Sequence, residues 1–115
     1  MAQLIDLTLV EEIRRIERAT GRNDVLSGFV LKLEAALAGF GAAFAGCVAR
    51  GDGAGAVRAA HTLKGTCRQL GAEALGEVFA EIEASAKAGD YAGAQRKFDA
   101  AADLVVQSIE ALKHA

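Results

Sequence analysis

The sequence contains no proline and no tryptophan, and its 115 residues include only two cysteines. Without proline, nothing in the chain forces a helix to break, and abundant alanine favours long helices. Aromatic residues make up only 5% of the chain and the formal net charge is −2, so neither base-stacking surfaces nor a basic field indicates nucleic-acid binding. Cys47 and Cys67 lack a metal-binding spacing. We expect both thiols to stay reduced, as in the cytoplasm, and we predict no metal site.

A long apolar segment is also missing. The longest run without a charged residue covers residues 35–49, which is shorter than the roughly 20 apolar residues of a membrane-spanning helix. The N-terminal residues carry acids early and lack the basic-then-apolar order of a signal peptide. Hydrophobic residues nevertheless make up 52% of the chain, enough for a packed core. We therefore predict a single cytoplasmic domain over residues 1–115, with no membrane association.

Apolar residues recur in steps of three and four along the chain, and no alternating strand pattern competes. The pattern predicts helices over about 8–19, 24–50, 53–70, 72–88 and 90–113. Glycine marks the turns between them, Asp52 and Asp90 are expected to cap the helices that follow two of these turns, and Asn23 or Asp24 is expected to cap the second helix.

Short connections make consecutive helices antiparallel neighbours. The expected fold is therefore all-α, an up-down antiparallel four-helix bundle with a short extra N-terminal helix packed across one end.

His61 is the residue whose surroundings indicate chemistry. It follows the inward-facing Ala60 by one position, which places it on the flank of the third helix. Gly65 lies one turn further on, where a glycine costs roughly 1 kcal/mol relative to alanine, so we infer that something approaches the imidazole closely. Lys64 adds positive charge for any anion held on the ring.

Residues of two other helices are expected beside His61. Glu83 lies as far beyond Gly71 as His61 lies before it, to within one helical pitch. Its carboxylate could accept a hydrogen bond from one ring nitrogen, which would fix the tautomer and leave the other nitrogen as a nucleophile. Small residues of the second helix, including Ala42 and Ala43, are expected at the same height and would leave the imidazole exposed.

The run from His61 to Ala72, HTLKGTCRQLGA, resembles the signature of histidine-containing phosphotransfer (HPt) domains. The resemblance extends over nearly the whole chain. It implies that His61 is phosphorylated, that Lys64 sits beside the phosphoryl group and that Gly65 makes room for it. Glu83 matches a position where the family often has Gln or Glu. Cys67 and Arg68 depart from the family pattern, in which Ala, Ser or Gly are commoner.

A docking surface for the partner is expected around His61. Helical spacing places part of it on the third helix, and the second helix adds small residues. The predicted docking residues are Val57, Arg58, Gly65, Arg68, Ala42 and Ala43.

The resemblance implies a phosphocarrier that takes a phosphoryl group from a receiver-domain aspartate and passes it to another. Its partners would be response-regulator receiver domains and, among kinases, a hybrid sensor kinase. The chain has no nucleotide-binding motif, so we expect no cofactor of its own, with Mg²⁺ supplied by the receiver, and a monomer. The alternative is a non-catalytic helical docking module in which His61 is incidental. A sensor-kinase dimerisation domain fits less well, because Thr62 stands where an acidic residue is expected and proline is missing.

Overall fold

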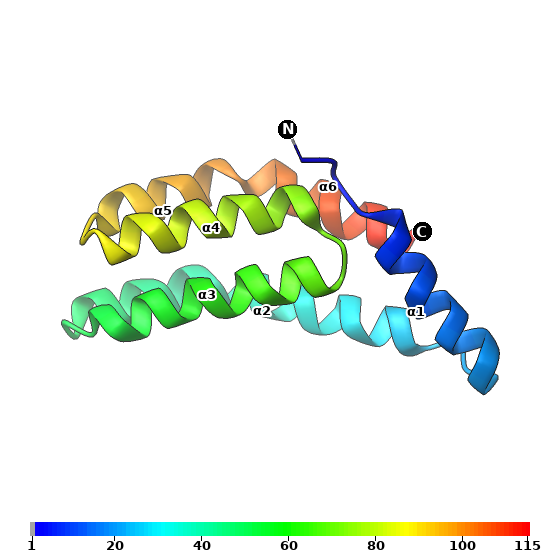
Figure 1. Cartoon of the computed structure of the whole chain (residues 1–115). Helices are drawn as coiled ribbons and strands as arrows, with labels where there is room; N and C mark the ends of the chain where they lie inside the picture. The colour runs from blue at the N-terminus through cyan, green and yellow to red at the C-terminus, as the bar shows by residue number, and fades with distance from the viewer. Residues whose placement is uncertain (1) are drawn as a thin grey trace.

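A computed structural model describes residues 2–115, in which all regular secondary structure is helical (Figure 1). This confirms the all-α prediction for that part of the chain. The helices are α1 (Leu7–Thr20), α2 (Val25–Ala49), α3 (Gly53–Gln69), α4 (Glu73–Lys87), α5 (Tyr91–Ala100) and α6 (Ala102–Lys113).

The helices form an elongated molecule of 47 × 27 × 19 Å. Helices α2, α3, α4 and α5 run alternately up and down, and α6 continues from α5 toward the end that α1 crosses (Figure 1). Contacts run from α2 to α3, from α3 to α4 and from α4 to α5, and both α5 and α6 return to α2. The closed set of contacts surrounds one hydrophobic core.

Phe40 of α2 lies at the centre of this core. Its ring centroid is 5.5 Å from that of Phe44, 5.1 Å from Phe79 of α4 and 4.8 Å from Phe98 of α5. The Phe79 contact is edge-to-face, a geometry that the ring quadrupoles favour. These aromatic contacts join three helices at mid-height and hold α4 at a fixed distance from α2.

Helix α2 has 25 residues and is apolar enough, by length and composition alone, to cross a membrane. The central helix of a soluble protein passes the same test. In this structure Leu33, Phe40 and Phe44 of α2 are buried against the other helices.

The caps predicted at two turns are present. The Asp52 carboxylate accepts a hydrogen bond from the Gly55 amide at 2.8 Å, and the Asp90 carboxylate accepts one from the Gly93 amide at 2.9 Å. In both places the carboxylate fills the space that a Cβ on the glycine would need. A side chain on the glycine three residues after the aspartate would therefore displace the capping carboxylate.

Asp24, one of the two residues predicted to cap α2, occupies the N-cap position, but its side chain makes no cap hydrogen bond. It pairs instead with Arg22, with 3.0 Å between carboxylate and guanidinium. The buried Glu17 of α1 takes its place, because its Oε2 atom accepts from the Val25 and Leu26 amides at 3.0 Å each. Arg14 holds the other Glu17 oxygen at 2.8 Å. An acid of one helix thus caps the next and fixes the angle between them.

The single helix predicted over 90–113 is divided in the structure. Helix α5 ends at Ala100 and α6 begins at Ala102. The Ala101 amide donates to the Phe98 carbonyl, three residues back, at 3.0 Å. No proline or glycine marks this point. The chain bends because Phe98 packs on the α2–α4 aromatic core, whereas Ile109 and Leu112 are buried at the other end of the molecule.

The turn between α3 and α4 is covered by the N-terminal segment. The Asp6 amide donates to the Gly71 carbonyl at 2.6 Å, and the Ala74 amide donates to the Gln3 carbonyl at 3.0 Å. Gly71 has φ +82°, and a Cβ there would lie 2.8 Å from the Asp6 carbonyl oxygen. Glycine is required at Gly71 for two reasons, its left-handed backbone and the segment packed over it.

The variant Gly71→Ala separates these two reasons when it is compared with Gly89→Ala. Gly89 has φ +79° and open space around its Cβ position, so alanine there adds only the left-handed strain of about 1–2 kcal/mol. We expect Gly71→Ala to lower the free energy of unfolding by more, because it also displaces Asp6. Urea unfolding of both variants measures the difference. Equal losses would show that the N-terminal segment does not hold this turn.

Candidate functional site

His61 and Glu83 face each other across the hairpin formed by α3 and α4. The antiparallel hairpin places His61 Nδ1 3.0 Å from Glu83 Oε2. The His61 side chain is 64% exposed, whereas that of Glu83 is only 6% exposed. The imidazole therefore stands at the surface, and one of its nitrogens touches a buried carboxylate.

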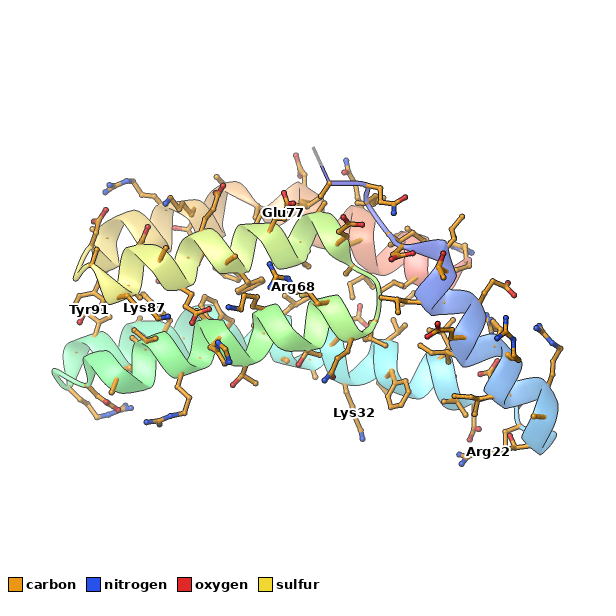
Figure 2. All side chains as sticks on the ribbon, viewed as in Figure 1. Arg22, Lys32, Arg68, Glu77, Lys87 and Tyr91 are labelled. Carbon is orange, nitrogen blue, oxygen red and sulfur yellow. The ribbon has the colours of Figure 1, made fainter. Side chains whose placement is uncertain are left out.

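Two lysines share the Glu83 carboxylate. Lys64 of α3 places Nζ 2.6 Å from Oε1, and Lys87 of α4 places Nζ 3.2 Å from Oε2. Oε1 is shielded from solvent, and the Lys64 contact is an ion pair without the alignment of a hydrogen bond. Figure 2 shows Lys87 extending from α4 toward α3. Glu83 thus joins three side chains from two helices.

The lysines keep Glu83 ionised. The Lys64 ammonium is the largest influence and lowers the pKa of the Glu83 carboxyl to about 2, with Lys87 and His61 adding to it against the opposing effect of burial. An ionised carboxylate is an acceptor only, so the ring nitrogen that touches it must donate. In the neutral ring the proton therefore lies on Nδ1, and the lone pair of Nε2 is free.

Gly65 leaves an opening beside this ring. A Cβ built on Gly65 would meet no atom within 4 Å, so packing within the chain does not demand glycine at this position. The residue lies within α3, four residues before its last residue, and alanine there would favour the helix by roughly 1 kcal/mol. The space beside His61 is open to a molecule approaching from outside.

The predicted docking residues lie on two sides of α3, one facing α4 and the other facing α2. Val57 is half-buried against the core, and Arg68 lies across Gly76 of α4, where a Cβ would be 3.0 Å from the Arg68 Cγ atom. Figure 2 shows Arg68 between α3 and α4. Arg58 and Ala43 line a groove of about 360 Å³ between α2 and α3.

Ala43 of α2 lies near the height of His61, because it lines a groove with the neighbouring Thr62, but His61 itself contacts α4. Helix α3 directs His61 toward α4, whereas the next residue, Thr62, lines the groove against α2 together with Ala43. Successive helical residues point about 100° apart, which accounts for the two directions. Ala42 is exposed, and Gly41 lies against the Phe98 ring of α5, 3.4 Å from its Cβ position. The imidazole is exposed because of its place on the flank of α3.

Lys87 was not among the residues predicted from the sequence. Its spacing of four from Glu83 on one helix was the available signal, because such pairs lie on the same face. Cys67 is buried and free, and burial raises the pKa of its thiol to about 12. It is a core residue, like Ala60 and Leu63 of the same helix.

Among residues 2–115, no group of three His, Cys, Asp or Glu side chains is placed to hold a metal ion. A family model described as the Hpt domain matches residues 8–115 of the chain. The chain belongs to the Hpt domain family. Members of this family carry out histidine phosphotransfer in phosphorelays, interact with response-regulator receiver domains and kinases, lack a kinase domain of their own and are generally soluble. Comparison with curated proteins and with solved structures gives no significant match.

The pH dependence of stability tests the ionised state of Glu83. Because folding lowers the pKa of this carboxyl from 4.5 to about 2, its contribution to stability is full above about pH 4.5 and is lost as the pH falls toward 2. We expect Glu83→Gln to be less stable than the wild type near pH 7, with the two unfolding free energies converging near pH 2. Denaturant titrations across this range measure both curves. A difference that stays constant with pH would contradict the ion-paired carboxylate.

Proposed function

We propose that His61 of this Hpt domain accepts a phosphoryl group from the phospho-aspartate of one receiver domain and passes it to the aspartate of another. The observation that carries the proposal is the contact of His61 Nδ1 with the buried, ionised Glu83. It leaves Nε2 with a free lone pair on an exposed ring.

In the forward step Nε2 attacks the phosphorus in line with the aspartyl oxygen. The P–O bond of the phospho-aspartate breaks, the P–Nε2 bond forms, and the aspartate leaves as a carboxylate. The Nδ1 proton stays on the ring and keeps its hydrogen bond to Glu83. Such transfer depends on positioning and charge compensation more than on covalent help.

The receiver domain would supply the remaining parts of the site. In this proposal Mg²⁺ belongs to the receiver, the chain has no cofactor of its own, and it acts as a cytoplasmic monomer. The receiver would dock over Gly65 and contact Val57, Arg58, Arg68, Ala42 and Ala43. The open space at the Gly65 Cβ position and the exposed Arg58 support this placement.

Transfer from a phosphorylated receiver tests the phosphoacceptor directly. We expect an acid-labile, base-stable phosphoryl label on the wild type. We expect none on His61→Gln, because glutamine lacks the imidazole nitrogen that attacks the phosphorus. His114, the second histidine of the chain, provides the matched control, and His114→Gln should be labelled like the wild type. Label on His61→Gln, or on neither protein, would contradict the proposed site. Retained receiver binding without any label would favour the non-catalytic docking module.

Gly65→Ala should separate stability from transfer. Alanine fits the open space and favours the helix, so we expect the free energy of unfolding to rise by up to about 1 kcal/mol. The added methyl group faces the incoming receiver and should slow transfer. Gly28→Ala is the matched control, because it also adds a methyl group to an open position in a helix away from His61. Thermal unfolding and the rate of label transfer give the two quantities. Unchanged transfer in Gly65→Ala would remove the docking role of Gly65.

A further inference from the structure

The outward side of α2 carries exposed apolar residues. A helix enclosed within a soluble protein is mostly buried, but only 28% of the most apolar 18-residue stretch of α2 is buried. Leu31 is 67% exposed, and Ala35 and Ala38, one and two turns further on, are exposed as well. An apolar surface of this kind marks a place where another molecule can bind.

Helix α6 extends this surface and forms a groove with α2. Val106 of α6 is 62% exposed and lines a hollow of about 230 Å³ together with Ala38 and Ile109. A second hollow, of about 300 Å³, continues along α2 toward α1 and reaches Leu26. Glu34 lines both hollows, so they adjoin. The groove therefore follows α2 for twelve residues, or about 18 Å, which matches three turns of a helix.

The charged residues of the two helices that form the groove are acids along most of its length. Residues 33–49 of α2 and 102–112 of α6 contain no lysine or arginine. The charged residues in these two stretches are Glu34, Asp103 and Glu110. Asp103 lies three residues before Val106, a spacing that puts both on one face of α6.

The basic groups near the groove are already paired. Lys113 lies 3.4 Å from Glu34, and His114 lies 3.3 Å from Glu110. Arg14, at the α1 end of the groove, is bound to Glu17 at 2.8 Å. Asp103 has no ion-pair partner among residues 2–115. Negative charge therefore remains beside Val106, at the end of the groove away from α1.

We propose that the groove between α2 and α6 binds an amphipathic helix of a partner protein, with basic residues beside its apolar face. The apolar face packs on Leu31, Ala38 and Val106, and the small alanine side chains let the helix axes approach closely. The basic residues pair with Asp103 and Glu110. The α3–α4 hairpin that carries His61 lies in front of α2 and α5 in Figure 1, so the groove is on the other side of the bundle and its occupant leaves His61 exposed.

The charge of the groove favours this occupant over two others. A second copy of the chain presents the same carboxylates, and like charges brought together in an interface repel. A membrane surface with anionic headgroups is disfavoured for the same reason. A basic helix supplies both the apolar face and the opposite charge.

A pair of synthetic peptides tests the proposal on the whole chain. The probe is a helical peptide of about 15 residues, with leucines three and four residues apart and lysines on both sides of them. The control peptide keeps the leucines and has glutamate in place of every lysine. Fluorescence anisotropy of the labelled peptides measures both affinities. We expect the basic peptide to bind about tenfold more tightly or better, and to shift the amide NMR signals of residues 31–38 and 102–113.

Substitutions in the groove separate its apolar and charged parts. Ala38→Arg puts a bulky cation in the groove at an exposed position and should weaken binding of the basic peptide about tenfold or more. Ala19→Arg is the matched control, because Ala19 is an exposed alanine of α1 outside the groove. Asp103→Asn combined with Glu110→Gln should weaken binding about three- to tenfold, the size of two exposed ion pairs. Added salt should weaken binding of the basic peptide to the wild type.

Equal affinities for the two peptides, or equal binding to Ala38→Arg and Ala19→Arg, would overturn the proposal. NMR shifts confined to the α3–α4 hairpin around His61 would do the same. A dimer in light scattering that Ala38→Arg dissociates would show that a second copy covers this face and would overturn the assignment to a partner helix. Peptide binding involves no phosphoryl transfer, so His61→Gln should bind like the wild type, and the inference stands or falls separately from the proposed function.

Discussion

The arrangement at the surface of α3 depends on one constraint, the burial of the Glu83 carboxylate. A carboxylate in this position must be paired, because an isolated buried charge is strongly unfavourable. Lys64 and Lys87 provide that pairing, and His61 fills the remaining hydrogen-bonding position on Oε2. The same contacts that make Glu83 tolerable inside the protein therefore orient the imidazole.

The contact between His61 and Glu83 depends on how the α3–α4 hairpin is held. Its register decides whether His61 and Glu83 meet, and a shift of one residue along either helix would move them apart by 1.5 Å. Gly71 lets the chain reverse sharply, and the N-terminal segment bonds to both sides of the turn through Asp6 and Gln3. At mid-height the contact between Phe40 and Phe79 fixes α4 against α2. Structure far from His61 thus sets the geometry of its ring.

The sequence was sufficient for the features that follow from local spacing. Helical periodicity predicted where most helices lie, and the Gly-Asp pairs predicted the caps at Asp52 and Asp90. The contact between His61 and Glu83 could be anticipated because two helices joined by a short turn must run antiparallel. Similar distances from Gly71, ten residues for His61 and twelve for Glu83, then translate into similar height.

Features that depend on tertiary packing could not be predicted from the spacing of residues in the sequence. The Glu17 cap of α2 comes from another helix, and its geometry depends on the crossing angle of α1. The bend at Ala101 lies within three consecutive alanines, whose side chains carry no signal of which way the chain turns. Which of two neighbouring residues contacts α4 also depends on packing, because one residue changes a helical direction by about 100°, so that His61 contacts α4 while Thr62 lines the groove against α2.

The choice of a carboxylate at residue 83 has a consequence for Lys64. A protonated carboxylic acid can donate a hydrogen bond, and burial alone favours the protonated form. If Glu83 donated to Nδ1, the ring proton would sit on Nε2, and the exposed nitrogen would have no lone pair for attack. The Lys64 ammonium prevents this by lowering the pKa of Glu83 to about 2. Lys64 thus acts on the imidazole through the carboxylate that it touches.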